Sequence, residues 1–170
     1  MSLQQLRRSA LPMLTAFIGS GGFIIGVWSF ISPAAAAQAF GGYMIRVLEA
    51  TAVSSKTDTS ASGSLDNAAN LAYVYPHGIR NLGQGLSILA LTAYWQFSPR
   101  CRNSPLARLT AQRCLGMVIT VGALTPIVDA WVNYQTAPDG AEEDLDRKAA
   151  RVHVMRTWIW LAGGLWCLLG

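Results

Sequence analysis

The run from Ala10 to Ile31 most constrains the fold, because it is apolar and contains no charged residue. About 20 helical residues cross the hydrocarbon core of a bilayer, so this run is long enough to span it. Three later runs are predicted as further spans: 77–97, 115–134 and 150–169. Only 13% of the residues are charged, against about 25% in an ordinary soluble domain. We predict an all-α polytopic membrane protein, one domain folded as a four-transmembrane-helix bundle.

The segments between these runs have different compositions. Residues 34–53 include a Gly-Gly pair together with Arg46 and Glu49, which makes them too polar for a span. We predict a short interfacial helix there, between spans one and two. Residues 54–70 are rich in Ser, Thr, Asp, Asn and Gly, a composition typical of a flexible polar loop. Two prolines mark Ser98–Cys114 as the connection between spans two and three.

Arginines set the expected orientation. Arg7, Arg8 and the four arginines of Ser98–Cys114 lie in segments without acidic residues. The positive-inside rule therefore places both termini in the cytosol, and we expect an endoplasmic reticulum protein whose first span is retained. Because topology explains most of the net charge of +4, we expect no nucleic-acid partner.

Polar residues recur at the start of the second span. His77, Arg80 and Gln84 are spaced by three and four residues, with Asn81 beside them, which places them on one face of a helix. In a four-span topology, Asp129, late in the third span, and His153, early in the fourth, arrive in the same leaflet. Ionisable residues inside a membrane are candidates for function. We therefore predict a polar pocket in the non-cytosolic half of the bundle.

The pocket offers acid–base chemistry and substrate contacts. The candidate proton donors and acceptors are Asp129, Glu49, His153 and His77. The candidate substrate-binding residues are Arg80, Asn81, Gln84, Trp131 and Trp158. Three alternatives remain open: an Asp129–Arg80 pair that only fixes helix register, tryptophans of an interfacial belt, and an Arg156 that reaches the head groups. The sequence contains no zinc spacing or Walker pattern, and we expect no metal and no cofactor.

Several motifs carry a resemblance to a known family. They are Pro33 with Phe40-Gly41, GIRNLGQGLSILAL at Gly78–Leu91, LTPIVDAW at Leu124–Trp131, and the late His153. The sequence resembles small four-helix membrane proteins of fungi and bacteria that are catalogued as a domain of unknown function, and in outline it is similar to the DoxX-like group. Arg80-Asn81 and Asp129 match the pattern of that family. Fungal relatives often accompany secondary-metabolite genes, so the resemblance implies a lipophilic polyketide or terpenoid substrate.

The resulting functional hypothesis is a membrane isomerase or cyclase that rearranges a lipophilic small molecule by proton transfer. The alternative is a noncatalytic scaffold or carrier for a biosynthetic enzyme or its product. The expected surroundings are the lipid bilayer. The protein partners left open are a second copy of the chain, forming a homo-oligomer, and a biosynthetic enzyme.

Overall fold

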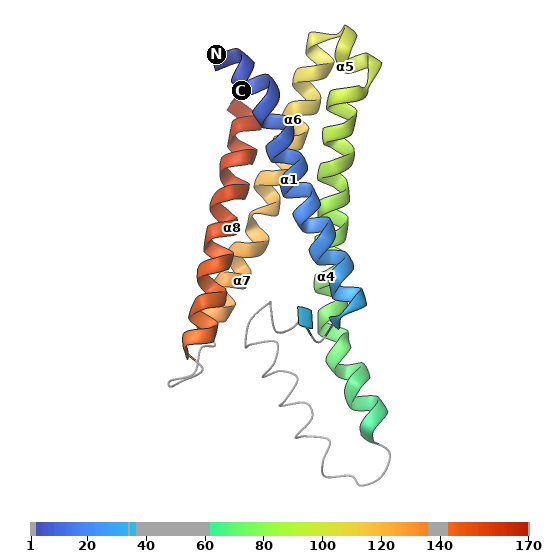
Figure 1. The fold of residues 1–170 in the computed structure, drawn as a ribbon, viewed down its shortest axis with the longest axis vertical. Coiled ribbons are helices and arrows are strands. Elements are labelled where there is room, and N and C mark those ends of the chain that lie inside the picture. The colour runs from blue at the N-terminus through green and yellow to red at the C-terminus, as the bar shows by residue number, and fades with distance from the viewer. Residues whose placement is uncertain (1–2, 34, 37–61, 136–142, 170) are drawn as a thin grey trace.

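The computed structural model describes residues 3–33, 35–36, 62–135 and 143–169 (Figure 1). All regular elements in these ranges are α-helices: α1 (Leu3–Ile31), α4 (Ser62–Phe97), α5 (Pro99–Asn103), α6 (Pro105–Gly122), α7 (Leu124–Gln135) and α8 (Glu143–Leu169). The predicted interfacial helix, apart from Ala35 and Ala36, lies outside the described residues, as does Glu49.

Three stretches are long and apolar enough to cross a membrane: Ala10–Ile31, Pro105–Val132 and Ala150–Leu169. The first and the last agree with the predicted bounds. The middle stretch begins at Pro105, whereas the sequence prediction began this span at residue 115. Helix α4 is not among these stretches, because the polar residues noted above lie in the middle of the helix. The structure therefore supports an all-helical chain suited to a bilayer, with three apolar membrane-crossing stretches in the described residues.

Helix α4 is longer than the predicted second span. It begins at Ser62 rather than His77, so residues 62–70, which the sequence analysis placed in a flexible loop, are helical. Alanine and leucine recur from Leu65 onward, and both residues favour helix. Local helix propensity therefore extends α4 beyond the apolar segment.

The Ser98–Cys114 connection is also helical. It contains α5 and the first part of α6, because Pro99 and Pro105 begin helices rather than mark a loop. Proline is well tolerated in the first turn of a helix, where its missing N–H has no partner to lose. Ser104 caps α6, and its hydroxyl accepts a hydrogen bond from the Ala107 N–H at 3.3 Å.

Pro126 explains why the third predicted span consists of two helices. Its ring would clash with the carbonyl of Gly122, four residues earlier, and it offers no N–H to that carbonyl. Helix α6 ends at Gly122 and α7 begins at Leu124. Asp129 lies on α7, one turn after the break.

Helix α1 lies along α4, and glycines allow the two backbones to approach closely (Figure 1). A Cβ atom on Gly22 would lie 3.2 Å from the carbonyl oxygen of Asn81, and one on Gly26 would lie 2.5 Å from the Leu82 nitrogen. Glycine at positions 22 and 26 therefore lets the two helix backbones approach closely. Farther along the same pair, the buried Thr92 hydroxyl donates to the Thr15 hydroxyl at 3.1 Å.

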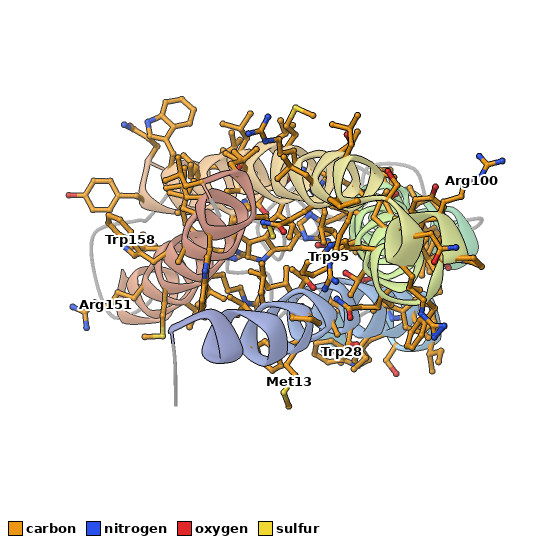
Figure 2. The ribbon with its side chains drawn as sticks, turned by 90° about the horizontal axis from the view of Figure 1, so that it is seen from above. Met13, Trp28, Trp95, Arg100, Arg151 and Trp158 are labelled. Carbon is orange, nitrogen blue, oxygen red and sulfur yellow. The ribbon has the colours of Figure 1, made fainter. Side chains whose placement is uncertain are left out.

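The two ends of the molecule differ. Both chain termini and α5 lie at one end in Figure 1, as expected if the head and the arginine-rich connection share one side. The opposite end holds the first turns of α4, which extend farthest, and the start of α8. Viewed along the bundle, Met13, Trp28 and Trp158 point away from it (Figure 2). Large apolar side chains on the outside are consistent with a lipid environment.

Candidate functional site

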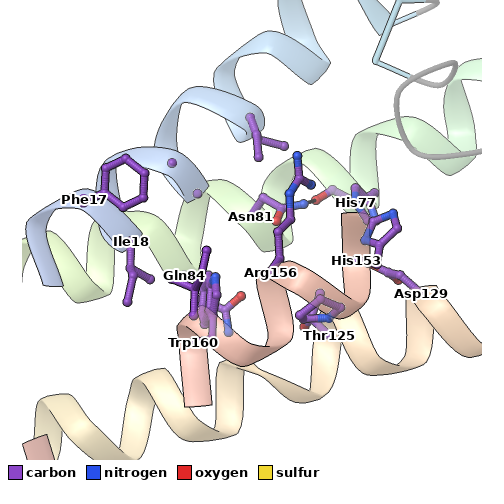
Figure 3. A pocket seen from close by; sticks show the side chains of 15 residues that line it. Phe17, Ile18, His77, Asn81, Gln84, Thr125, Asp129, His153, Arg156 and Trp160 are labelled. Carbon is purple, nitrogen blue, oxygen red and sulfur yellow. Dashed lines mark hydrogen bonds between the residues drawn. The ribbon is translucent and has the colours of Figure 1, made fainter. Parts of the chain in front are cut away.

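One cavity, with a volume of about 330 Å³, is lined by residues of α1, α4, α7 and α8 (Figure 3). Its lining is polar on one side and apolar on the other. The polar and charged lining residues are His77, Asn81, Gln84, Thr125, Asp129, His153 and Arg156. Ligand sites in proteins commonly combine a mostly apolar wall with a few converging polar groups.

Helix α4 supplies three of the polar side chains, at a spacing that places them on one face. Asn81 donates from Nδ2 to the carbonyl oxygen of His77 at 2.9 Å, which fixes its amide beside the cavity. Gln84 lies one turn deeper. Its Nε2 occupies the position that a Cβ atom on Gly122 would need. The glycine at the end of α6 therefore makes room for Gln84.

An ion pair links α4 to α7. Arg80 Nη2 lies 3.3 Å from both carboxylate oxygens of Asp129. The same nitrogen lies 2.7 Å from Nδ1 of His77. Because a guanidinium only donates, Nδ1 of His77 accepts, and a neutral His77 carries its proton on Nε2. Arg80 therefore contacts both the Asp129 carboxylate and the His77 ring.

Helix α8 brings the other histidine and a second arginine. His153 is 3% exposed, and its carbonyl accepts from the Thr157 hydroxyl at 3.0 Å. His153, Arg156 and Trp160 are spaced by three and four residues and all line the cavity. His77, Asp129, His153 and Arg156 all line the cavity, and Arg80 contacts the first two of them. The polar groups of three helices therefore form one electrostatic cluster.

The apolar wall comes mainly from α1 and α8. Its large side chains are Phe17, Ile18, Ile25, Ile159 and Trp160. Gly21 also lines the cavity, and a Cβ atom at this position would meet nothing within 4 Å. Phe17 is 69% exposed, so it lies where the cavity meets the outer surface of the bundle.

Five predicted site residues line this cavity: His77, Asn81, Gln84, Asp129 and His153. Arg80 is positioned next to them through its contacts with Asp129 and His77. The Arg80–Asp129 pair that the sequence analysis left open is present, and its carboxylate also faces the cavity.

Trp131 and Trp158, which the sequence placed among the substrate-binding candidates, lie outside the cavity. They are 62% and 68% exposed and do not line the cavity, because each lies on the outward face of its helix. The lining tryptophan is Trp160. Arg156 was expected at the head groups, but it lines the cavity too. The signal that identifies both is their helical spacing from His153, which places all three on one face.

Comparison with known proteins identifies one related family. The family model for a domain of unknown function, DUF4267, matches residues 19–167. No curated protein and no solved structure matches the chain. The matched range includes all the cavity-lining residues except Phe17 and Ile18.

Proposed function

The chain belongs to the DUF4267 family, and we propose that it binds a lipophilic metabolite in the cavity and rearranges it by proton transfer. The observation that carries the proposal is the composition of the cavity wall. Asp129, His77 and His153 meet on one side, whereas the opposite wall is apolar. A pocket that combines proton donors and acceptors with an apolar wall suits the movement of a proton on a lipophilic substrate.

The membrane arrangement is part of the proposal. We infer that α4 is the fourth span, because it packs along α1 and also contacts α6, both of which include membrane-crossing stretches. Its polar face then points into the bundle rather than into lipid, where Arg80 meets Asp129. We infer that the protein lies in the endoplasmic reticulum membrane with both termini in the cytosol. The cavity then lies toward the lumenal leaflet.

The proposed reaction is an isomerisation. A C–H bond next to a substrate carbonyl breaks, its proton goes to the Asp129 carboxylate, and the electron pair moves onto the carbonyl oxygen. Cationic and N–H groups of the cavity stabilise that oxygen. Donation from His77 or His153 to another carbon of the conjugated system then completes the shift. In the same step the other nitrogen of that imidazole takes up the Asp129 proton, directly or through water, so no imidazolate forms and atoms and electrons balance. A cyclisation initiated by protonation would use the same groups.

A substitution that fills the cavity with a larger side chain tests the proposal. Gly21→Leu is expected to abolish ligand binding and product formation, because its side chain enters the cavity without striking another helix. Membranes carrying the variant are compared with wild type by chromatography and mass spectrometry of extracted metabolites.

Gly83→Leu is the matched control. Gly83 also has nothing within 4 Å of its Cβ position, and it does not line this cavity. The control variant is expected to behave as wild type. Equal activity of Gly21→Leu and wild type, at equal protein amounts, would contradict a reaction in this cavity.

A noncatalytic carrier or scaffold is the second candidate. It is favoured by four exposed arginines at the α5 end: Arg100, Arg102, Arg108 and Arg113. Such a surface suits anionic lipid or an acidic enzyme partner. If the protein is a carrier, the Asp129→Asn variant still binds the metabolite, and neither wild type nor the variant forms a rearranged product. If it is an enzyme, wild type forms the product and the Asp129→Asn variant does not.

A further inference from the structure

We propose that the ligand is an anionic lipophile whose carboxylate binds Arg156, with its apolar part along Phe17 and Ile159. This inference rests on the proposed function, since it names the class of compound that the same cavity accepts. It also assigns Arg156 as the group that orients the ligand.

The charge balance of the cavity is the first support. Among the described residues, two guanidinium groups, Arg80 and Arg156, meet a single carboxylate, Asp129. That carboxylate pairs with Arg80 at 3.3 Å. It also attracts Arg156 electrostatically, but Arg156 has no ion pair or hydrogen bond within the described part of the chain. Within the described residues, one positive charge at the cavity wall therefore has no contact partner.

The position of Arg156 makes this charge costly when the cavity is empty. The residue lies within the apolar stretch Ala150–Leu169, where a cation needs a partner or access to a head group. A bound carboxylate provides the partner. The planar guanidinium matches a carboxylate with two parallel N–H bonds, so an anion gains more here than a neutral oxygen does.

The shape of the cavity indicates the rest of the ligand. Phe17 of α1 and Ile159 of α8 both line the cavity and are both exposed on the surface. In a bilayer that surface faces acyl chains. The cavity is therefore open toward lipid between α1 and α8, and an apolar chain can reach it from the membrane while its carboxylate reaches Arg156.

Binding to the full chain in phosphatidylcholine nanodiscs tests this inference, with dodecanoate and its methyl ester as probes and empty nanodiscs as the blank. Wild type is expected to bind dodecanoate about 10- to 100-fold more tightly than the ester, the range for a hydrogen-bonded charge. Arg156→Gln removes this preference, whereas Arg156→Lys keeps part of it. Arg151→Gln, an exposed arginine on the same helix, leaves it unchanged. Thermal unfolding checks that each variant is folded.

The contrary outcomes are distinct. Failure of wild type to bind dodecanoate, equal affinity for both probes, or equal effects of Arg156→Gln and Arg151→Gln would overturn the anionic ligand. If Gly21→Leu nevertheless abolishes product formation, the proposed function stands with a neutral substrate. If dodecanoate binds through Arg156 but Asp129→Asn leaves product formation unchanged, the ligand class stands and the proton-transfer role fails.

Discussion

Asp129→Asn is expected to lower the rate of product formation by about 10²- to 10⁴-fold, the range that a positioned acid or base contributes. Asparagine has nearly the size of aspartate, but its amide cannot accept the substrate proton. Membranes with equal amounts of wild-type and variant protein are supplied with extract from cells that lack the protein. Product is then quantified over time.

The Arg80→Gln variant distinguishes a catalytic role of Asp129 from a purely structural role of the Arg80–Asp129 pair in fixing helix register. It breaks the same 3.3 Å ion pair but leaves the Asp129 carboxylate in the cavity. Losing the pair leaves the Asp129 carboxylate without its Arg80 partner inside the bundle, so a loss of stability is expected, and activities are compared at equal protein amounts. We expect much more residual activity in Arg80→Gln than in Asp129→Asn. Equal losses, together with equal drops in protein abundance, would mean that the pair only fixes the register.

Gly85→Ala is expected to lower the free energy of unfolding by about 3 kcal/mol, the upper part of the usual range for overpacking. The added Cβ would contact the Phe23 nitrogen and lie 2.7 Å from the carbonyl oxygen of Gly19. Both contacts are backbone, so no side chain can move aside, and α1 and α4 must separate. Unfolding by sodium dodecyl sulfate in mixed micelles measures the change.

Gly83→Ala is the control for that experiment. It lies on the same helix two residues earlier, and nothing lies within 4 Å of its Cβ position. Alanine is a better helix former than glycine by about 1 kcal/mol, so this variant is expected to equal or exceed wild-type stability. Similar destabilisation by both variants would contradict close backbone packing at Gly85.

Apolar length made the first and last membrane-crossing stretches predictable from the sequence. Ala10–Ile31 and 150–169 agree with the structure because few other local signals compete within them. The boundaries of α4 and α6 were not predictable in this way. At Ser62 and Pro105, helix propensity and first-turn prolines continue the helix into polar sequence. The hydropathy pattern identifies the segment that fits the hydrocarbon core of a membrane. It does not identify the ends of the helix, which depend on backbone hydrogen bonding.

The polar wall of the cavity was predictable where helical spacing and topology agreed. His77, Asn81 and Gln84 share a face, and topology brings Asp129 and His153 to them. The aromatic wall was not predictable in the same way. Trp158 and Trp160 are two residues apart on α8, and only the rotation of α8 against its neighbours decides which one faces inward.

The most direct test of the central claim is deuterium incorporation in membranes incubated in D₂O with extract from cells that lack the protein. Wild type is expected to consume one lipophilic compound and to form an isomer of the same elemental composition. The isomer carries one deuterium at carbon, and Asp129→Asn forms essentially none. Consumption without an isomeric product, or identical profiles for wild type and Asp129→Asn at equal protein amounts, would contradict proton transfer in this cavity.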